Sequence, residues 1–249
     1  MKYNKNYFET VKGTVSPIEQ NWKFEKILPA LKIFFKQTKL KNIKLLEIGA
    51  GSGFFIKNLK EKFKDLNIKI FALEINKDSA EYLKKIIPEK NIIINDISKK
   101  TKFKNKDFNL CVAIDVLEHI EDLQGAVNEI KRIADYLIIK IPIEKSLGLG
   151  LINIITLGKY RRKAISEQGH IHWFTANEIL SILKNNFASI EYIEYTNIGL
   201  HQFRKYYYRS KPIKTLLAIW YLMSAILFRV SKYLNAIIFG DHIIVLVKC

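Results

Sequence analysis

Three glycines within five positions are the residues of this chain with the clearest chemical meaning. Gly49, Gly51 and Gly53 follow the apolar run 43–48 and precede a segment, 54–63, whose apolar residues recur at helical spacing. This pattern predicts a buried strand, a glycine turn and a helix. A turn built from glycines lets a ligand approach bare backbone, so the segment is a candidate binding site.

A carboxylate follows at a distance that suits a nucleoside. Glu74 ends the next apolar run, about 20 residues after the turn, where a carboxylate can accept both hydroxyls of a ribose. The alternative is an exposed acid at the end of a strand. A dinucleotide turn would need a third glycine where Phe54 stands, so the NAD-dependent oxidoreductases are disfavoured.

The elements that position these residues follow from short apolar runs that alternate with helix-like segments. The runs predict strands followed by crossover helices, and therefore an α/β fold with a doubly wound, mostly parallel sheet. Ligands in such sheets bind beyond the carboxyl ends of the strands, where the strand order reverses. The predicted strands are 43–48, 68–74, 91–96, 108–115, 135–142, 189–195 and 241–249.

Two helix starts are also predicted. Ser16 is a candidate cap, with Pro17 in the first turn and Glu19 placed for a capping box. This helix either covers the site or packs on the sheet, and we expect the packing role. A second helix is expected to be capped near Thr175.

Composition bounds the class of protein. The 249 residues are 49% apolar, enough for one substantial core, so a single domain is expected. Cys111 and Cys249 form no disulfide framework or zinc cluster, and the first residues lack the apolar stretch of a secretory signal. A cytoplasmic protein is predicted. The 41 basic and 24 acidic residues leave a formal charge of +17, which can attract phosphates or anionic lipid.

Five segments in order resemble the motifs of class I S-adenosylmethionine-dependent methyltransferases, over about residues 40–195 and the last strand. They are LLEIGAGSGFF (45–55), Glu74, NDIS (95–98), DFNLCVAIDVLEHIED (107–122) and GHIHWFTANEIL (169–180). The chain is most similar to the broad group that contains the ubiquinone and menaquinone biosynthesis methyltransferases. It departs from many members by lacking a Lys-Pro-Gly-Gly-like turn before the fifth strand.

The resemblance implies a Rossmann-like methyltransferase fold with a seven-stranded sheet, and a single domain over 1–249. Its parts would be an N-terminal helical segment (1–40), a cofactor-binding core (41–142) and apolar, basic cap insertions (143–168 and 197–240).

It also implies the residues that bind S-adenosyl-L-methionine. Backbone amides at the glycines would reach the methionyl part, with Glu47 stabilising the loop or the amino group and Asp115 near the amino-acid end. Glu74 would hold the ribose, and the adenine would contact Ile75, the Asp96 carboxylate and the Ile97 amide. Asp96 has an alternative role as a turn former. The implied set is Glu47, Gly49, Gly51, Gly53, Glu74, Ile75, Asp96, Ile97 and Asp115.

The candidate catalytic residues are Glu118, His119 and His170. A histidine with a pKa near neutrality can deprotonate an acceptor hydroxyl. In the alternative, the two residues belong to the start of a helix, where the helix dipole favours the negative charge of Glu118 and His119 packs against the loop. Asp115, Glu118 and His119, completed by His170 or His172, also resemble a divalent-metal site of some relatives. No metal is predicted, because Asp115 already has a cofactor role.

Two segments, 146–166 and 196–240, combine apolar side chains with basic residues and contain no Asp or Glu. The uncharged run 215–228 has 14 residues, short of the roughly 20 that span a bilayer, so no transmembrane helix is predicted. The segments are either helices packed on the sheet or a surface for an anionic membrane. RKYYYRSK (204–211) could instead stack on nucleic-acid bases.

These patterns predict a methyltransferase that acts on a small or lipid-linked acceptor, at oxygen. Peripheral contact with an anionic membrane is the preferred partner interaction, and nucleic acid is less favoured. No Asn-Pro-Pro-Tyr or Asp-Pro-Pro-Tyr follows the fourth strand, which argues against methylation of DNA-base amino groups. The alternatives are a non-catalytic module that docks on membrane or RNA, and an RNA methyltransferase.

Overall fold

The protein is described by a computed structural model over residues 17–207 and 213–249. It contains a seven-stranded sheet with the order β3-β2-β1-β4-β5-β7-β6, in which β7 runs antiparallel to both of its neighbours. The predicted α/β fold with a mostly parallel sheet is therefore confirmed. The strands are β1 (Asn42–Ile48), β2 (Asn67–Glu74), β3 (Ile92–Ile94), β4 (Phe108–Ile114), β5 (Ala134–Ile143), β6 (Ser189–Tyr195) and β7 (Asp241–Lys248).

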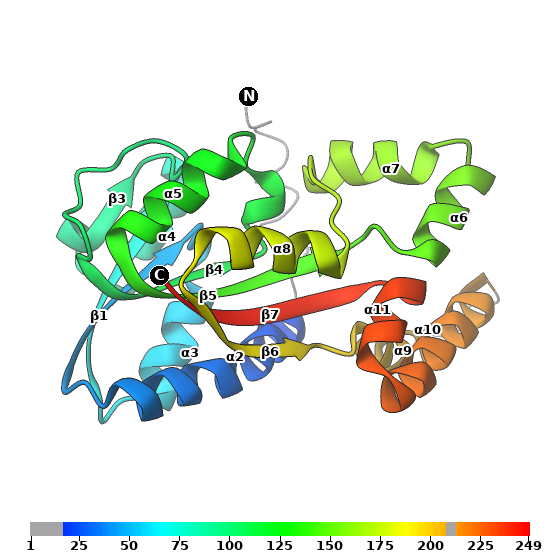
Figure 1. Cartoon of the computed structure of the whole chain (residues 1–249), viewed down its shortest axis with the longest axis horizontal. Helices are drawn as coiled ribbons and strands as arrows, with labels where there is room; N and C mark the ends of the chain where they lie inside the picture. The colour runs from blue at the N-terminus through cyan, green and yellow to red at the C-terminus, as the bar shows by residue number, and fades with distance from the viewer. Residues whose placement is uncertain (1–16, 208–212) are drawn as a thin grey trace.

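Helices cover both faces of this sheet (Figure 1). Successive side chains of a strand point to opposite faces, so Leu45 joins one core cluster and Leu46 the other. The Leu45 face packs against α2 (Pro17–Thr38), α3 (Phe54–Lys62) and α4 (Lys77–Leu83). The Leu46 face packs against α5 (Leu123–Ile133) and α8 (Ala176–Asn186). Burial on both faces explains the nearly continuous apolar runs.

Most of the predicted boundaries are close to those observed. Pro17 opens α2, whereas Ser16 lies outside the described residues. Thr175 caps α8 in a capping box with Glu178. The edge strand β3 is shorter than the predicted 91–96, because only Ile92–Ile94 pair with β2. The connection before β5 is short: α5 ends at Ile133 and β5 begins at Ala134.

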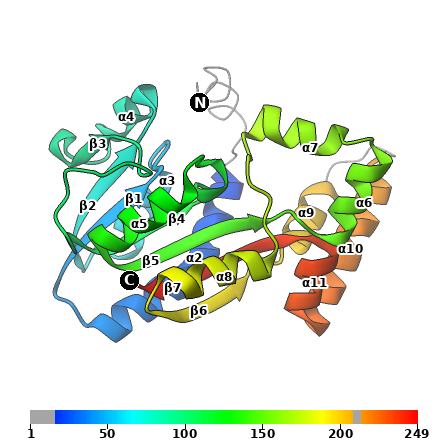
Figure 2. The same ribbon diagram turned by 45° about the horizontal axis from the view of Figure 1, so that its top comes forward.

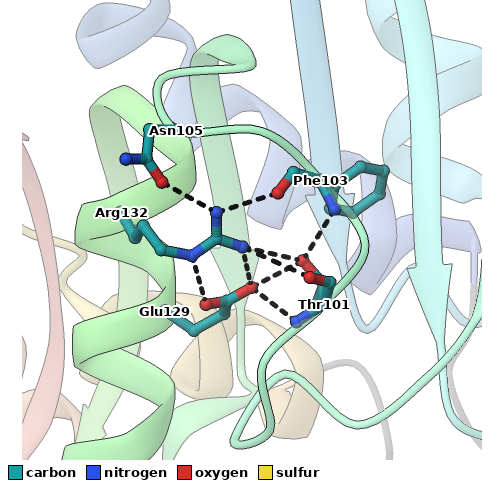
Figure 3. Close-up of polar contacts among 5 residues, drawn as sticks. All are labelled: Thr101, Phe103, Asn105, Glu129 and Arg132. Atoms are coloured by element: carbon teal, nitrogen blue, oxygen red, sulfur yellow. Dashed lines mark hydrogen bonds and ion pairs between the residues drawn. The ribbon is translucent and has the colours of Figure 1, made fainter.

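The loop between β3 and β4 is fastened to α5 by a polar network (Figure 3). Glu129 accepts hydrogen bonds from the Thr101 amide at 2.7 Å and from both Nε and Nη2 of Arg132. Arg132 also donates to the Phe103 carbonyl and to Asn105. Two such charge-assisted bonds in parallel favour one geometry, so this loop is held against α5.

The remaining helices gather at one end of the sheet (Figures 1 and 2). We call them the helical cap, and they are α6 (Leu147–Ile155), α7 (Lys159–Lys163), α9 (Ile198–Tyr207), α10 (Ile213–Val230) and α11 (Lys232–Phe239). A π-helical turn, Ala164–Gln168, follows α7. Within residues 17–207 and 213–249, no helix is long and apolar enough to cross a membrane. The predicted division of the chain into core and cap insertions stays a prediction.

Candidate functional site

The predicted site residues lie where the strand order of the sheet reverses. Strand β1 pairs with β2 on one side and β4 on the other, so the chain winds outward in opposite directions from this point. The loops after β1, β2 and β4 therefore meet at one edge. A crevice outside the carboxyl ends of the strands at such a point is the usual ligand site of open α/β sheets.

The glycine loop takes a backbone conformation that side chains disfavour. Gly49, Gly51 and Gly53 have φ values of 68°, 50° and 70°. A Cβ on Gly49 would lie 2.6 Å from Val116, in the loop after β4, so the two loops approach closely. A Cβ on Gly51 would meet no atom within 4 Å. The half-buried backbone at Gly51 therefore has room beside it for a ligand.

Glu74 ties this loop to the end of β2. Its Oε2 accepts a hydrogen bond from the Gly51 amide at 2.8 Å, and its Oε1 accepts one from the Asn76 amide at 2.9 Å. The carboxylate is buried. Glu47 is buried as well, and its Oε2 has no hydrogen-bond partner among the described residues. Burial, together with the charge of Glu74, raises the pKa of Glu47 well above its ordinary value.

The residues implied to contact adenine lie in the loops after β2 and β3. Asp96 accepts hydrogen bonds from the Ser98 amide at 2.9 Å and the Ser98 hydroxyl at 2.8 Å, so it does form the turn that was its alternative role. The Ile75 side chain is 39% exposed beside Glu74, while Ile97 is buried. The adenine-binding roles of Asp96, Ile75 and Ile97 stay predictions.

Asp115 lies between two lysines. It accepts a short hydrogen bond from Lys140 of β5 and forms an ion pair with Lys23 of α2 at 2.9 Å. Burial raises the pKa of Asp115, but the two ammonium groups outweigh it and hold this pKa well below its usual range. Asp115 also has a φ of 53°, a conformation uncommon outside glycine. The loop after β4 is therefore held by buried charge as well as by its backbone.

Glu118 and His119 follow Asp115 in a 3₁₀ turn, Leu117–His119. Glu118 is fully buried, and neither carboxyl oxygen has a hydrogen-bond partner among the described residues. Burial and the negative charge of Asp115 raise the pKa of Glu118 well above its ordinary value. Burial and the neighbouring His170 lower the pKa of His119 to about 4. His119 is therefore neutral near pH 7, and its lowered pKa makes the imidazole a weaker base than a free histidine.

His170 joins this turn from the segment before α8. Its ring lies edge-on to His119, with centroids 4.8 Å apart, and its Nδ1 lies 2.9 Å from Oε2 of Glu144. The Nδ1 of His119 lies 3.1 Å from the Gly169 carbonyl. In each histidine the acceptor beside Nδ1 requires the proton there, which makes Nε2 the nitrogen that can accept.

Three of the residues considered for a metal come together. The ligand atoms of Glu118, His119 and His170 lie within 4.8 Å of one another. His172 does not join them, because its Nε2 contacts the Ile120 carbonyl at 2.8 Å. Two imidazoles and a carboxylate would suit a divalent transition metal. Since Asp115 is held by lysines, the described cluster offers three protein ligands, and the absence of a metal stays a prediction.

Three residues that contact the candidate site were not predicted from the sequence. Lys140 and Lys23 hold Asp115, and Glu144 contacts His170. The sequence could have indicated Lys140, because a charged residue inside the apolar run of a buried strand needs a partner. The position of Glu144 directly after β5 was a weaker indication, and Lys23, in a helix rich in exposed charges, had none.

The comparisons with known proteins agree with this geometry. A family model described as "Methyltransferase domain" matches residues 46–135, the stretch from the glycine loop to the start of β5. No curated protein sequence matches the chain.

Solved structures match almost the whole chain at low identity. Phosphoethanolamine N-methyltransferase 2 of Haemonchus contortus, in complex with S-adenosyl-L-methionine, is 14% identical with a TM-score of 0.58 over 99% of this chain and 60% of that one. Geranyl diphosphate C-methyltransferase of Streptomyces coelicolor is 10% identical, with a TM-score of 0.55 over 89% and 80% of the two chains. A protein from Pyrococcus horikoshii is 15% identical, with a TM-score of 0.56 over 98% and 99%. The chain thus spans about 60% of the length of the Haemonchus enzyme.

Proposed function

We propose that this class I S-adenosylmethionine-dependent methyltransferase transfers a methyl group to a hydroxyl oxygen of a small or lipid-linked acceptor. The family match agrees with the resemblance predicted from the motifs, while the closer likeness to the ubiquinone and menaquinone group stays a prediction. One observation carries the proposal: an open glycine loop, fastened by Glu74, adjoins a turn bearing Glu118 and His119 at the reversal of strand order.

The cofactor is S-adenosyl-L-methionine, bound along the carboxyl ends of β1 and β2. Amides at Gly49, Gly51 and Gly53 approach its methionyl part through the open side of the loop. Glu74 holds the ribose hydroxyls, because two backbone amides already fix the orientation of its carboxylate. Asp96 lies one strand further along, at the adenine end.

Methyl transfer from a sulfonium disperses positive charge in an in-line displacement, so the protein contributes mainly by positioning the two reactants. The residues after β4 supply the acid–base chemistry. His119 is neutral at the pH of the cell, and His170 is oriented by Glu144. In the proposed reaction, Nε2 of one of the two rings takes the proton of an acceptor hydroxyl while the oxygen attacks the methyl group. The lowered pKa of His119 makes it a weaker base for this step than a free histidine.

The class of acceptor is supported by two features of different kinds. One Haemonchus structure contains phosphomonomethylethanolamine and the Streptomyces structure contains geranyl diphosphate, so small acceptors fit this fold. Those enzymes methylate nitrogen and carbon, so transfer to oxygen rests on the histidine pair alone. The lipid linkage and a peripheral contact with an anionic membrane rest on the helical cap.

The second candidate function is a module that has kept the fold and docks on membrane or RNA without catalysis. Its support is the absence of Asp and Glu from 146–166 and 196–240. An RNA methyltransferase, the third candidate, would combine the catalytic site with RNA binding by these acid-free segments. Binding of the cofactor without transfer to any acceptor favours the non-catalytic module, and transfer to RNA favours the third candidate.

The first experiment is calorimetric titration with S-adenosylmethionine and S-adenosylhomocysteine. Gly51→Arg should abolish binding, because its side chain would fill the space beside the loop, where a Cβ meets no atom. Gly150→Arg is the matched control, since a Cβ on Gly150 in the cap also meets nothing within 4 Å. Binding that persists in Gly51→Arg, or a wild-type protein that binds neither compound, would contradict the proposal.

Transfer is then measured with a methyl-labelled cofactor and acceptors drawn first from membrane extracts. His119→Ala and His170→Ala should lower transfer while leaving the affinity for the cofactor within about twofold, because neither ring belongs to the proposed cofactor site. Equal loss of affinity and transfer in both variants would argue against a catalytic role.

A further inference from the structure

Helix α6 presents a solvent-exposed apolar face. Its large side chains at i, i+4, i+7 and i+8 lie on one side of the helix, where a helix that faced only water would carry polar residues. The only residue of α6 that is fully buried is Gly148. The exposed side chains are Leu147, Leu151, Ile154 and Ile155, between 57% and 72% exposed, and Leu157 follows the helix at 81%.

Helix α10 repeats this arrangement. Its exposed apolar side chains recur at i, i+3, i+4, i+7 and i+11 and again share one face. On the opposite side Ser224 and Ala225 are buried, whereas Leu217 near the start of the helix is 40% exposed. The exposed side chains are Ile219, Leu222, Met223, Ile226 and Val230, between 40% and 78% exposed.

The two helices belong to one packed unit. A Cβ on Gly148 of α6 would lie 2.2 Å from the indole ring of Trp220 in α10, so only glycine permits this contact. The Trp220 ring also lies edge-on to Phe239 of α11, with centroids 4.7 Å apart. In both views α6, α10 and α11 stand together beyond the end of β5 (Figures 1 and 2). The two apolar faces are therefore held in a fixed relation by the cap.

The charge around these faces is positive. Glu167 and Glu194 flank the acid-free segments and pair with Lys163 at 3.7 Å and with Lys232 at 2.7 Å. The exposed cations Lys159, Arg162 and Arg229 make no ion pair with any residue of the described ranges. Helix α10 carries one of these cations and α6 leads directly into the helix that carries the other two. Exposed aliphatic side chains close in sequence to exposed cations match the chemistry of an anionic lipid surface, in which acyl chains lie beneath negative headgroups.

We infer that the exposed faces of α6 and α10 form a bilayer-docking surface for anionic lipid. Helix α6, with nine residues, cannot span a bilayer, so it lies in the plane of the headgroups. RNA fits less well, because bases stack on aromatic rings and the exposed residues of these faces are aliphatic. The role of this surface rests on the proposed function: it would bring the candidate site to a lipid-linked acceptor in the membrane.

The test is flotation of the purified protein with vesicles of phosphatidylcholine alone or of phosphatidylcholine mixed with phosphatidylglycerol. The wild-type protein should bind the mixed vesicles, and binding should weaken as salt screens the cations. The double variants Ile154→Ser/Ile155→Ser and Leu222→Ser/Met223→Ser should each weaken binding at least about tenfold, since interfacial affinity scales with apolar area. The matched control is Leu40→Ser/Leu66→Ser, which removes two exposed leucines that precede β1 and β2.

Thermal unfolding and calorimetry with S-adenosylmethionine accompany each variant and separate this inference from the proposed reaction. An unchanged melting temperature and cofactor affinity, with lost flotation, support the docking surface. A wild-type protein that binds the cofactor but not the mixed vesicles would overturn the docking surface and leave the proposed reaction standing. Salt-sensitive binding of a single-stranded RNA without vesicle binding would also overturn the docking surface. Vesicle binding without cofactor binding would overturn the reaction and leave the surface standing.

Discussion

Glu118 is a buried carboxyl without a described hydrogen-bond partner. It lies within the field of Asp115, whose negative charge is retained because Lys23 and Lys140 surround it. The two acids thus divide the roles: Asp115 is ionised, while burial favours the protonated form of Glu118. A carboxyl with a raised pKa beside two histidines is typical of a functional site.

This difference predicts a pH-dependent stability. The folded protein raises the pKa of Glu118 above its unfolded value, so folding binds a proton and the free energy of unfolding falls as pH rises through that interval. Glu118→Gln removes the free-energy cost of keeping an ionisable carboxyl buried at high pH, because glutamine carries no charge at any pH. We expect the variant to be more stable than the wild type at pH 8 and nearly equal to it at pH 4, measured by urea unfolding without ligand.

The matched control is Glu61→Gln, an exposed carboxyl on α3 that should change stability little at either pH. A Glu118→Gln variant that is destabilised equally at both pH values would show that Glu118 is ionised and satisfied in the folded protein.

Individual site residues could be predicted from the sequence where the residue type and its position after a strand were enough to indicate a role. Glu74 ends a strand, and Glu118 and His119 lie in the turn that follows one, so all three could be predicted as candidates. The Glu144 contact with His170 could not, because it joins the end of β5 to a loop 26 residues later. Such pairings depend on how the segments fold back and leave no local pattern.

The turn between β1 and α3 is the element on which the proposed cofactor site depends. Each of its three glycines has a positive φ, but they differ in what surrounds them. A Cβ on Gly53 would lie 2.5 Å from Ile86 and 2.8 Å from Leu83, so the turn packs directly on α4 and the residues after it. Gly51 has no such neighbour. The turn therefore has one side built for packing and one side open to a ligand.

A pair of alanine substitutions separates these sides. Gly53→Ala suffers both backbone strain and a clash with α4, and we expect it to lower the free energy of unfolding by about 2 to 4 kcal/mol. Gly51→Ala suffers strain alone and should cost about 1 kcal/mol. Chemical denaturation of both variants checks the difference, and equal losses would mean that the contact with α4 does not constrain the turn.

The elements were largely predictable because parallel strands and their helices have local signatures. Apolar runs located all seven strands, and Thr175 marked the start of α8. The edge strand β3 was predicted too long, because Asn95 and Asp96 follow the apolar run directly but form a turn and pair with no strand.

At the scale of the molecule, the last strand is the one whose placement the sequence did not reveal. Strand β7 lies between β5 and β6 and pairs with both in antiparallel register. No local pattern specifies that the final segment enters the interior of the sheet. Its side chains Ile243 to Val247 are all fully buried, and they contribute to both core clusters. The fold is therefore completed by residues far in sequence from the site.

This placement predicts a global effect of a distant substitution. Val245 pairs with Ile139 of β5 and Ile193 of β6. Val245→Asp would bury an unpaired charge between β5 and β6, which costs more than about 4 kcal/mol, a large part of the stability of a domain. We expect the variant to lose its cooperative melting transition and with it the binding of S-adenosylmethionine.

Lys248→Asp, at the exposed end of the same strand, should melt within a few degrees of the wild type, because an exposed substitution changes stability by less than about 0.5 kcal/mol. A Val245→Asp protein that melts cooperatively near the wild-type temperature would mean that β7 is not an interior strand, and the cofactor site would then be independent of it.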